Sequence, residues 1–206
     1  MTSDLIGILA LQGNFAEHGY ILDKLGVAHR KVRLPRDLEG LSGLIMPGGE
    51  STTMSKLMVF NELEKPLRDA LASGLPVFGT CAGMILLADE VLDTRADAIS
   101  LSAIDMTVRR NAFGRQVDSF ETDLDMPTLK IADGEPPVHA AFIRAPWVER
   151  MGEAVEVLAR VPETAGEAAG TVVGVRQNSA MATSFHPEST GETRVHEYFL
   201  RELVGI

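Results

Sequence analysis

The chain has 206 residues, of which 45% are hydrophobic and 23% charged, with a single cysteine. This length and composition predict one globular domain over residues 1–206 and argue against disorder. A net charge of −10 repels phosphate backbones and anionic membranes, so we expect neither nucleic acid nor a membrane as a partner. The start of the chain lacks the basic segment of a secretory signal, and no apolar stretch approaches the ~20 residues that span a bilayer. We therefore expect a cytoplasmic protein.

The first half of the chain alternates short apolar runs with longer helical patterns. Strands are predicted at residues 5–11, 29–34, 43–46 and 76–79, and helices at residues 15–25, 52–73 and 84–88. Such alternation is typical of a parallel sheet that is covered by helices on both faces. The apolar run at residues 5–11 favours an interior strand.

The second half is rich in β-type segments that alternate apolar with polar residues. They are predicted at residues 99–108, 116–120, 140–143, 154–161, 171–176 and 180–185 and are typical of antiparallel or mixed strands. Apolar residues recur at helical spacing between Glu192 and Val204 and predict a closing amphipathic helix. The fold class is therefore α/β, a three-layer sandwich with a largely parallel central sheet and an added β-rich region.

The strongest chemical signal is the sequence Gly79-Thr80-Cys81-Ala82-Gly83 between an apolar strand and an apolar helix. A nucleophile on such a sharp strand-to-helix elbow needs flanking glycines, because side chains there would collide with the backbone. A helix that begins at Ala82 would place N–H groups and a positive dipole end beside the sulfur. The alternative interpretation is a buried structural cysteine.

A thiol nucleophile needs a base, and His186 in the sequence His186-Pro187-Glu188 follows a late strand. Residues two apart on an extended chain project to the same side, so Glu188 would orient the imidazole while the other ring nitrogen faces Cys81. By itself the motif also fits a histidine in an ordinary core or surface position. His18, His29, His139 and His196 have no such pattern, and we interpret them as structural or surface residues.

A third element, the sequence PGGES that includes Gly48 and Gly49, follows the apolar strand at residues 43–46. Two glycines let the backbone approach a ligand and point an N–H inward, as an oxyanion hole requires. The loop is not a phosphate loop, because it lacks the lysine and has Glu50 in its place. The alternative is an ordinary turn with Ser51 as the helix N-cap.

Taken together, these motifs resemble the class I, triad-type glutamine amidotransferases, and more narrowly the glutaminase subunits of two-component pyridoxal 5′-phosphate synthases. The elbow and the HPE motif are shared by the wider superfamily, whereas ALQGN, PGGEST, RNAFGRQ and FIRAP are particular to the narrower family. The matching segments lie in the family's order at residues 8–14, 44–54, 79–88, 110–120, 142–146 and 184–188.

The resemblance implies hydrolysis of glutamine to glutamate and ammonia, with no cofactor and no metal. Cys81 would attack the carboxamide, and backbone N–H groups of Ala82 and of the Gly48-Gly49 turn would hold the oxyanion. His186 would move the protons and Glu188 would orient it.

The family's glutamine site maps onto a set of residues that suits the charges of glutamine in part, since a carboxylate attracts an arginine and an ammonium attracts a carboxylate. The set consists of Gly49, Glu50, Ser51, Arg110, Ile143 and Arg144. For the two arginines, surface ion pairs remain the alternative. Gln12 is a candidate for the partner interface.

The family's partner is a TIM-barrel pyridoxal 5′-phosphate synthase subunit that receives the ammonia. The resemblance also implies a glutaminase that is weak without this partner, with the Gly48-Gly49 peptide reoriented in the complex. The segment between Asp125 and Val138 departs from the family's compact core and is interpreted as a longer surface loop.

Two other function classes compete with this interpretation. One is a cysteine hydrolase or chaperone-like protein on the same scaffold, which would share the elbow and a histidine but not the PGGES and FIRAP motifs. The other is a binding module without turnover, for which a broken triad would be expected.

Overall fold

The computed structural model describes residues 4–95, 97–112, 119–129 and 134–206. Its main sheet runs in the order β2-β1-β3-β4-β12-β11-β9-β6-β5, and β10 pairs with β11. The first five strands in this order are parallel, as predicted for the four from the first half of the chain; the fifth, β12, was predicted among the antiparallel or mixed strands. They are β2 (His29–Val32), β1 (Ile6–Leu9), β3 (Gly43–Met46), β4 (Val77–Thr80) and β12 (Ala180–Thr183). β1 is fully buried and paired on both edges, so it is the interior strand that its apolar run predicted.

The remaining strands form the added β-rich region. They are β5 (Ala88–Leu92), β6 (Ile104–Arg109), β9 (Trp147–Met151), β10 (Glu156–Arg160) and β11 (Val172–Gln177). Their pairings are antiparallel except for the parallel pair β5 and β6. A separate antiparallel hairpin is made of β7 (Ser119–Leu124) and β8 (Val138–Ile143). The predicted mixture of antiparallel and parallel strands is confirmed.

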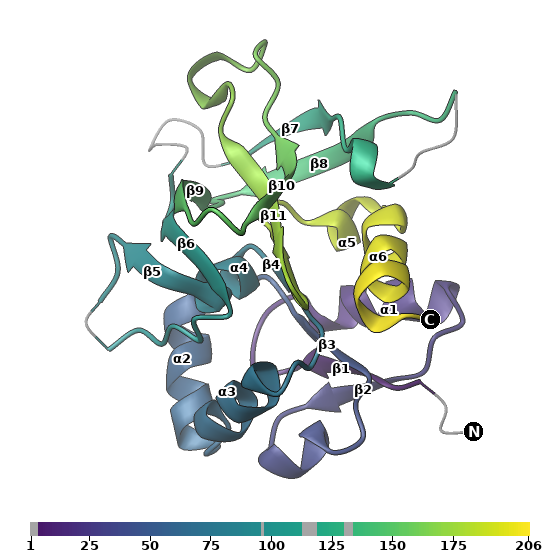
Figure 1. Cartoon of the computed structure of the whole chain (residues 1–206), viewed down its shortest axis with the longest axis vertical. Helices are drawn as coiled ribbons and strands as arrows, with labels where there is room; N and C mark the ends of the chain where they lie inside the picture. Colours follow the sequence, from purple (N-terminus) through teal and green to yellow (C-terminus); the bar gives the residue numbers. More distant parts are fainter. Residues whose placement is uncertain (1–3, 96, 113–118, 130–133) are drawn as a thin grey trace.

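Helices cover both faces of the parallel half of the sheet (Figure 1). On one face lie α2 (Ser51–Phe60), α3 (Glu64–Ala72) and α4 (Ala82–Leu87). On the other lie α1 (Phe15–Lys24), α5 (Pro187–Thr190) and α6 (Arg194–Phe199), which a π-helix continues over Leu200–Val204. Short 3-10 turns occupy Pro35–Leu38, Pro127–Leu129 and Gly166–Ala168. The three-layer α/β sandwich is thus confirmed.

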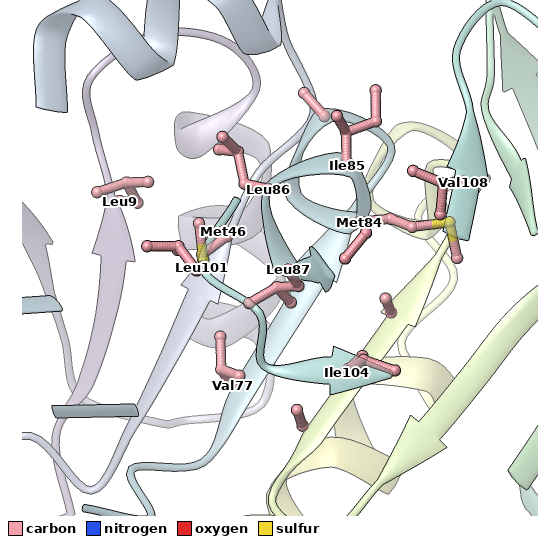
Figure 2. Packing of buried hydrophobic residues seen from close by; sticks show 14 of the residues in the cluster. Leu9, Met46, Val77, Met84, Ile85, Leu86, Leu87, Leu101, Ile104 and Val108 are labelled. Carbon is pink, nitrogen blue, oxygen red and sulfur yellow. The ribbon is translucent and has the colours of Figure 1, made fainter. Parts of the chain in front are cut away.

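Each face of the sheet has its own hydrophobic core. On the α4 side, Met84, Leu86 and Leu87 pack against residues of the strands beneath, as Figure 2 shows. On the α1 and α6 side, Leu22 and Phe199 contact the opposite faces of the same strands. Burial on both faces explains why the parallel strands are almost wholly apolar. Within the described ranges, no helix is long and apolar enough to cross a membrane.

The single helix predicted for residues 52–73 is wrong. It is divided by a turn in which Glu62 has a left-handed φ of 54° and the Leu63 N–H donates to the Met58 carbonyl at 2.9 Å. This is the hydrogen-bond pattern of a Schellman helix end, which turns the following apolar residue back toward the core. Leu63 is fully buried, so its burial outweighs the helical pattern across the break.

The strand predicted at residues 99–108 is shorter than expected, and β5 and β9 were not predicted. Leu101 and Ala103 donate their N–H groups to the carbonyls of Leu86 and Leu87 at 2.8 and 3.0 Å. They therefore satisfy the C-terminal carbonyls of α4, and the strand begins only at Ile104. Of the strand predicted at residues 116–120, residues 116–118 lie outside the described residues. So do residues 113–116 of the RNAFGRQ motif and residues 130–133 of the segment between Asp125 and Val138.

The turn from β4 to α4 is packed against the neighbouring strand with no room for a side chain. A Cβ at Gly83 would lie 2.1 Å from the Met46 carbonyl oxygen, and one at Gly79 would lie 2.7 Å from the backbone of Gly83. Real Cβ atoms do not approach backbone so closely, so both glycines are required where the sequence predicted them.

Helix α2 begins with an acidic cap. The carboxylate of Glu50 accepts the N–H groups of Thr52 at 3.0 Å and Thr53 at 2.7 Å, so Glu50 and not Ser51 is the N-cap. Burial raises the pKa of Glu50, but the hydrogen bonds from Thr53 and Thr52 outweigh it and lower the pKa to about 2. A negative charge at this end of a helix is also favoured by the helix dipole.

Replacing Gly83 with alanine should lower the free energy of unfolding by about 3 kcal/mol, because α4 must move away from β3. The matched control is Gly19→Ala within α1, where the added Cβ meets side chains and no backbone: the His29 ring at 3.2 Å and Ile8 at 3.7 Å. Urea denaturation of both variants measures the difference. Equal stability of Gly83→Ala and Gly19→Ala would contradict the packing argument.

Glu50→Gln should lower stability by about 1 kcal/mol near neutral pH, because the cap loses its charge. The folded pKa lies below the usual value, so the stabilisation is present above pH 4.5 and is lost as the pH falls toward 2. Urea denaturation from pH 2 to 7 should show the two stability curves converging at the acid end. An unchanged gap at pH 2, or an equal effect of Glu153→Gln at an exposed position, argues against the cap.

Candidate active site

The carboxyl ends of four adjacent parallel strands bring the predicted site residues together. Gln12 follows β1, Gly48 follows β3, Cys81 follows β4 and His186 follows β12. The strand order reverses between β1 and β3, and ligands of open α/β sheets bind outside the carboxyl ends at such a point. The site lies where the topology alone would place it.

Cys81 stands on the elbow between β4 and α4. Its backbone has φ 47° and ψ −100°, a left-handed conformation that a side chain rarely adopts, and its N–H donates to the Thr183 carbonyl at 2.8 Å. The sulfur lies 4.0 Å from the Ile143 carbonyl oxygen, and the residue is 6% exposed. Such strained backbone is held in place by its surroundings and is concentrated at functional sites.

His186 lies between Cys81 and Glu188. Its Nδ1–H donates to Glu188 Oε1 at 2.7 Å, and the Cys81 side chain lies close enough to raise the pKa of the imidazole. Burial lowers the pKa of His186, but the bonds to Cys81 and Glu188 and their charges outweigh it, so the pKa lies above its usual value. The arrangement favours a protonated imidazole that is paired with the Glu188 carboxylate.

The predicted extended geometry of the HPE motif is wrong in one respect. Pro187 is the first residue of α5, so Glu188 lies in a helical turn and not on an extended chain. Proline fits the first helical position because its missing N–H would have no partner there. The turn still carries the Glu188 carboxylate back to His186.

Residues of α1 and α6 that sequence reasoning missed surround Glu188. Asn14 Nδ2 donates to Oε1 at 3.4 Å, and His18 Nε2 lies 3.6 Å from Oε2. His18 also contacts Thr80 Oγ1 at 3.2 Å and His196 Nε2 at 2.8 Å. In the sequence, the spacing of four residues shows only that Asn14 and His18 share one helix face. That they face Glu188 follows only from the position of α1 in the structure.

Glu188 is an anion held deep in the protein. Burial raises its pKa, but the electrostatic interactions with His18 and His186 and the hydrogen bond from His186 outweigh it, so the pKa lies below its usual value. By contrast, His29 and His139 pair with the surface carboxylates of Asp23 and Asp123, as the prediction of surface roles expects.

The Gly48-Gly49 loop lies directly against the histidine. A Cβ at Gly48 would lie 2.2 Å from His186 Cε1, so only glycine lets the ring approach. The Gly48 carbonyl accepts the Asn14 N–H at 3.0 Å, and the Gln12 side-chain oxygen accepts the Glu50 N–H at 2.6 Å. The loops after β1 and β3 are therefore joined to each other beside the imidazole.

Glu50 and Arg110 form an ion pair at the start of α2, with Arg110 Nη2 3.4 Å from Glu50 Oε1. Arg110 also donates to Thr52 Oγ1 at 3.5 Å and is mostly buried, with 18% of its side chain exposed. Ser51 is buried in the first turn of the same helix. The carboxylate of Glu50 is thus already engaged by the helix and by Arg110.

The structure gives fewer contacts for the other predicted binding residues. Ile143 is 47% exposed, and its carbonyl is the oxygen beside the Cys81 sulfur. Arg144 follows it with a left-handed φ of 45° and an exposed side chain. Ala82 is the first residue of α4, next to the thiol. Among the residues that the structure describes, no group of three histidine, cysteine or acidic side chains could hold a metal ion.

Comparisons with known proteins agree with this geometry. The SNO glutamine amidotransferase family profile matches residues 8–205. The whole chain is 58% identical to the whole of pyridoxal 5′-phosphate synthase subunit PdxT of Rhodococcus opacus. It is 59% identical to the PdxT subunit of Corynebacterium jeikeium over 96% of this chain and 95% of that protein. A solved structure described as a glutamine amidotransferase superposes with a TM-score of 0.85 at 46% identity, covering 98% of this chain and 99% of that chain.

The family match extends over the elbow, the glycine loop and the HPE motif, which are the segments that meet at the carboxyl edge of the sheet. Relatives of more than half identity over nearly the full length support the same assignment. The chain therefore belongs to the SNO glutamine amidotransferase family.

Proposed function

We propose that residues 1–206 act as one glutaminase domain, which hydrolyses the side-chain amide of L-glutamine to L-glutamate and ammonia and delivers the ammonia to a pyridoxal 5′-phosphate synthase partner. The observation that carries the proposal is the buried group of Cys81, His186 and Glu188 in a chain of this family, with His186 hydrogen-bonded to Glu188 at 2.7 Å and influenced by the Cys81 side chain. A thiol paired with an oriented imidazole is the arrangement of nucleophilic acyl transfer.

The reaction needs two proton transfers by His186. The Cys81 thiolate attacks the carboxamide carbon, and the carbon–nitrogen bond breaks as His186 gives its proton to the departing ammonia. The product is a γ-glutamyl thioester on Cys81. His186, now neutral, takes a proton from water, which attacks the thioester carbon and breaks the carbon–sulfur bond to release glutamate. Glu188 holds the imidazole in the orientation that both steps require.

The oxyanion of each tetrahedral intermediate is held by backbone N–H groups of Ala82 and of the Gly48-Gly49 turn. The Gly48 carbonyl is bound to the Asn14 N–H at 3.0 Å, so reorientation of this peptide requires that hydrogen bond to break. Cys81 as a whole residue is also only 6% exposed, so glutamine must meet a more open site than this one. Both features support a glutaminase that its partner activates.

We place the glutamine-binding site at Gly49, Glu50 and Ser51 and the residues around them. Arg110 and Arg144 offer positive charge to the α-carboxylate of the substrate, and Glu50 offers negative charge to its ammonium. Because Glu50 and Arg110 are paired with each other here, substrate binding involves an exchange of this ion pair for contacts with glutamine. Ile143 lines the same side of the thiol.

The proposed partner is a TIM-barrel synthase subunit, in keeping with relatives named as pyridoxal 5′-phosphate synthase subunits. Ammonia released into water at neutral pH becomes mostly ammonium, so its transfer within a complex preserves the nucleophilic form. Gln12, beside the glycine loop, is the interface residue that we propose. This chain supplies no cofactor to the reaction, and the cytoplasm as its location stays a prediction.

Cys81→Ala should lower glutamate release by at least about a thousandfold, because the nucleophile is lost. The assay measures glutamate formed from glutamine by the complex with a candidate synthase subunit, and thermal unfolding confirms that the variant is folded. Release that persists in Cys81→Ala would rule out the thiol mechanism. No release by the unsubstituted complex, with a thiol that still reacts, would favour the cysteine hydrolase or chaperone-like alternative.

The synthase subunit should raise glutamate release per chain by about a hundredfold, the contribution expected of one oxyanion-hole donor. The measurement compares the chain alone, with the synthase subunit, and with an unrelated β/α-barrel protein as the control. Equal rates with and without the synthase subunit would show that the glycine loop needs no partner to adopt its active form.

A further inference from the structure

The triad chemistry leaves unexplained a fully buried histidine that reaches the site from α1. His18 has no exposed surface, and its Nε2 lies 3.6 Å from Glu188 Oε2, on the side of the carboxylate away from His186. Its other contacts are the Thr80 hydroxyl at 3.2 Å and His196 at 2.8 Å. A buried polar side chain needs partners, and these three groups supply all of the partners that the described residues give it.

Glu188 needs a second source of positive electrostatic potential. Its side chain is fully buried, and Oε1 accepts from His186 and Asn14, whereas Oε2 has no partner within hydrogen-bond distance among the described residues. A buried carboxylate oxygen without a donor carries a large desolvation penalty. His18 Nε2 is the group that faces this oxygen, so the protonation of that nitrogen decides whether the contact is attractive or repulsive.

Both histidines are neutral, so each ring carries one N–H. Burial is the largest influence on both rings: it lowers the pKa of His18, and together with the neighbouring His18 it lowers the pKa of His196 to about 3. If His196 Nε2–H donates to His18 Nδ1, the N–H of His18 lies on Nε2, where it faces Thr80 and Glu188. If instead His18 Nδ1–H donated to His196 Nε2, the lone pair of His18 Nε2 would face the Glu188 carboxylate oxygen.

The surroundings of His196 favour the first direction. Its Nδ1 has no hydrogen-bond partner in the described residues, and the Glu192 backbone, which favours the protonated ring, is the smallest of the influences on its pKa. An unpartnered imidazole nitrogen costs less than a buried carboxylate oxygen that faces a lone pair. The N–H groups of the two histidines therefore align toward Glu188.

We propose that His18 is a positioning residue, whose Nε2–H faces Glu188 Oε2 and, together with Asn14 on Oε1, fixes the carboxylate that orients His186. Asn14 caps α1 and His18 lies four residues further on, so both project from one face of the helix onto the two oxygens. His196 sets the tautomer of His18. The proposal rests on the glutaminase function for its catalytic consequence, but its geometry does not depend on the substrate.

The test compares His18→Leu, which removes the N–H, with His18→Gln, whose amide nitrogen retains a donor near the position of Nε2. In the complex with the synthase subunit, His18→Leu should lower turnover roughly tenfold, the scale typical of outer partners of a site. The KM for glutamine should stay within about twofold, because His18 does not reach the substrate, and His18→Gln should recover most of the turnover. Turnover is counted per reactive thiol, which is unambiguous because the chain has one cysteine.

Phe199→Leu is the control for destabilisation alone, because Phe199 packs against Phe78, a ring that His18 also contacts. It should leave turnover per reactive thiol unchanged. The proposal would be overturned if His18→Leu turned over glutamine at the unsubstituted rate, or if the turnover of His18→Gln were as slow as that of His18→Leu.

Two further measurements need no glutamine turnover. The rate of Cys81 alkylation by iodoacetamide should fall in His18→Leu and recover in His18→Gln, because a misplaced Glu188 no longer supports the imidazolium beside the thiolate. Nitrogen-15 NMR of the imidazoles should show His18 with its proton on Nε2, and a proton on Nδ1 would overturn the proposal. If the unsubstituted complex releases no glutamate, the proposed function fails, while these two results still decide the role of His18.

Discussion

The site depends on the parallel pairing of β12 with β4. Their register pairs Thr80 with Thr183, and the Cys81 N–H continues the ladder by donating to the Thr183 carbonyl at 2.8 Å. This bond holds the strained elbow and fixes how far the following residues of β12 extend past it, so His186 arrives beside the thiol. The close approach of Gly83 to the Met46 carbonyl anchors the other side of the elbow to β3. The nucleophile and its base are thus positioned by backbone, and side chains only refine the geometry.

Buried charge is the second constraint on the site. Burial by itself favours the neutral forms of His186 and Glu188, and the mutual hydrogen bond at 2.7 Å with their other partners reverses that preference. A buried pair of this kind is maintained only when its remaining hydrogen-bonding positions are filled. From helix α1, Asn14 donates to Oε1 and His18 lies 3.6 Å from Oε2, so a helix distant in sequence from the HPE motif belongs to the electrostatics of the site.

Local patterns predicted most of the fold and the centre of the site. The elbow glycines, the buried strands and the glycine loop each follow from local sterics or periodicity, and the structure places them as expected. The helical position of Glu188, the break at Glu62 and the role of His18 depend on tertiary contacts. Leu63 turns inward because a core exists to receive it, and His18 matters because α1 packs beside α5. The two partners of such a contact lie far apart in the sequence, so a local pattern cannot reveal it.

The central claim is that Cys81 is the nucleophile for glutamine. The most direct measurement is peptide mapping by mass spectrometry after reaction of the complex with a glutamine-analogue electrophile, with and without excess glutamine. One adduct is expected, on Cys81, and it should form more slowly when glutamine is present. An adduct on another residue, or labelling of Cys81 at a rate that glutamine does not change, would contradict it.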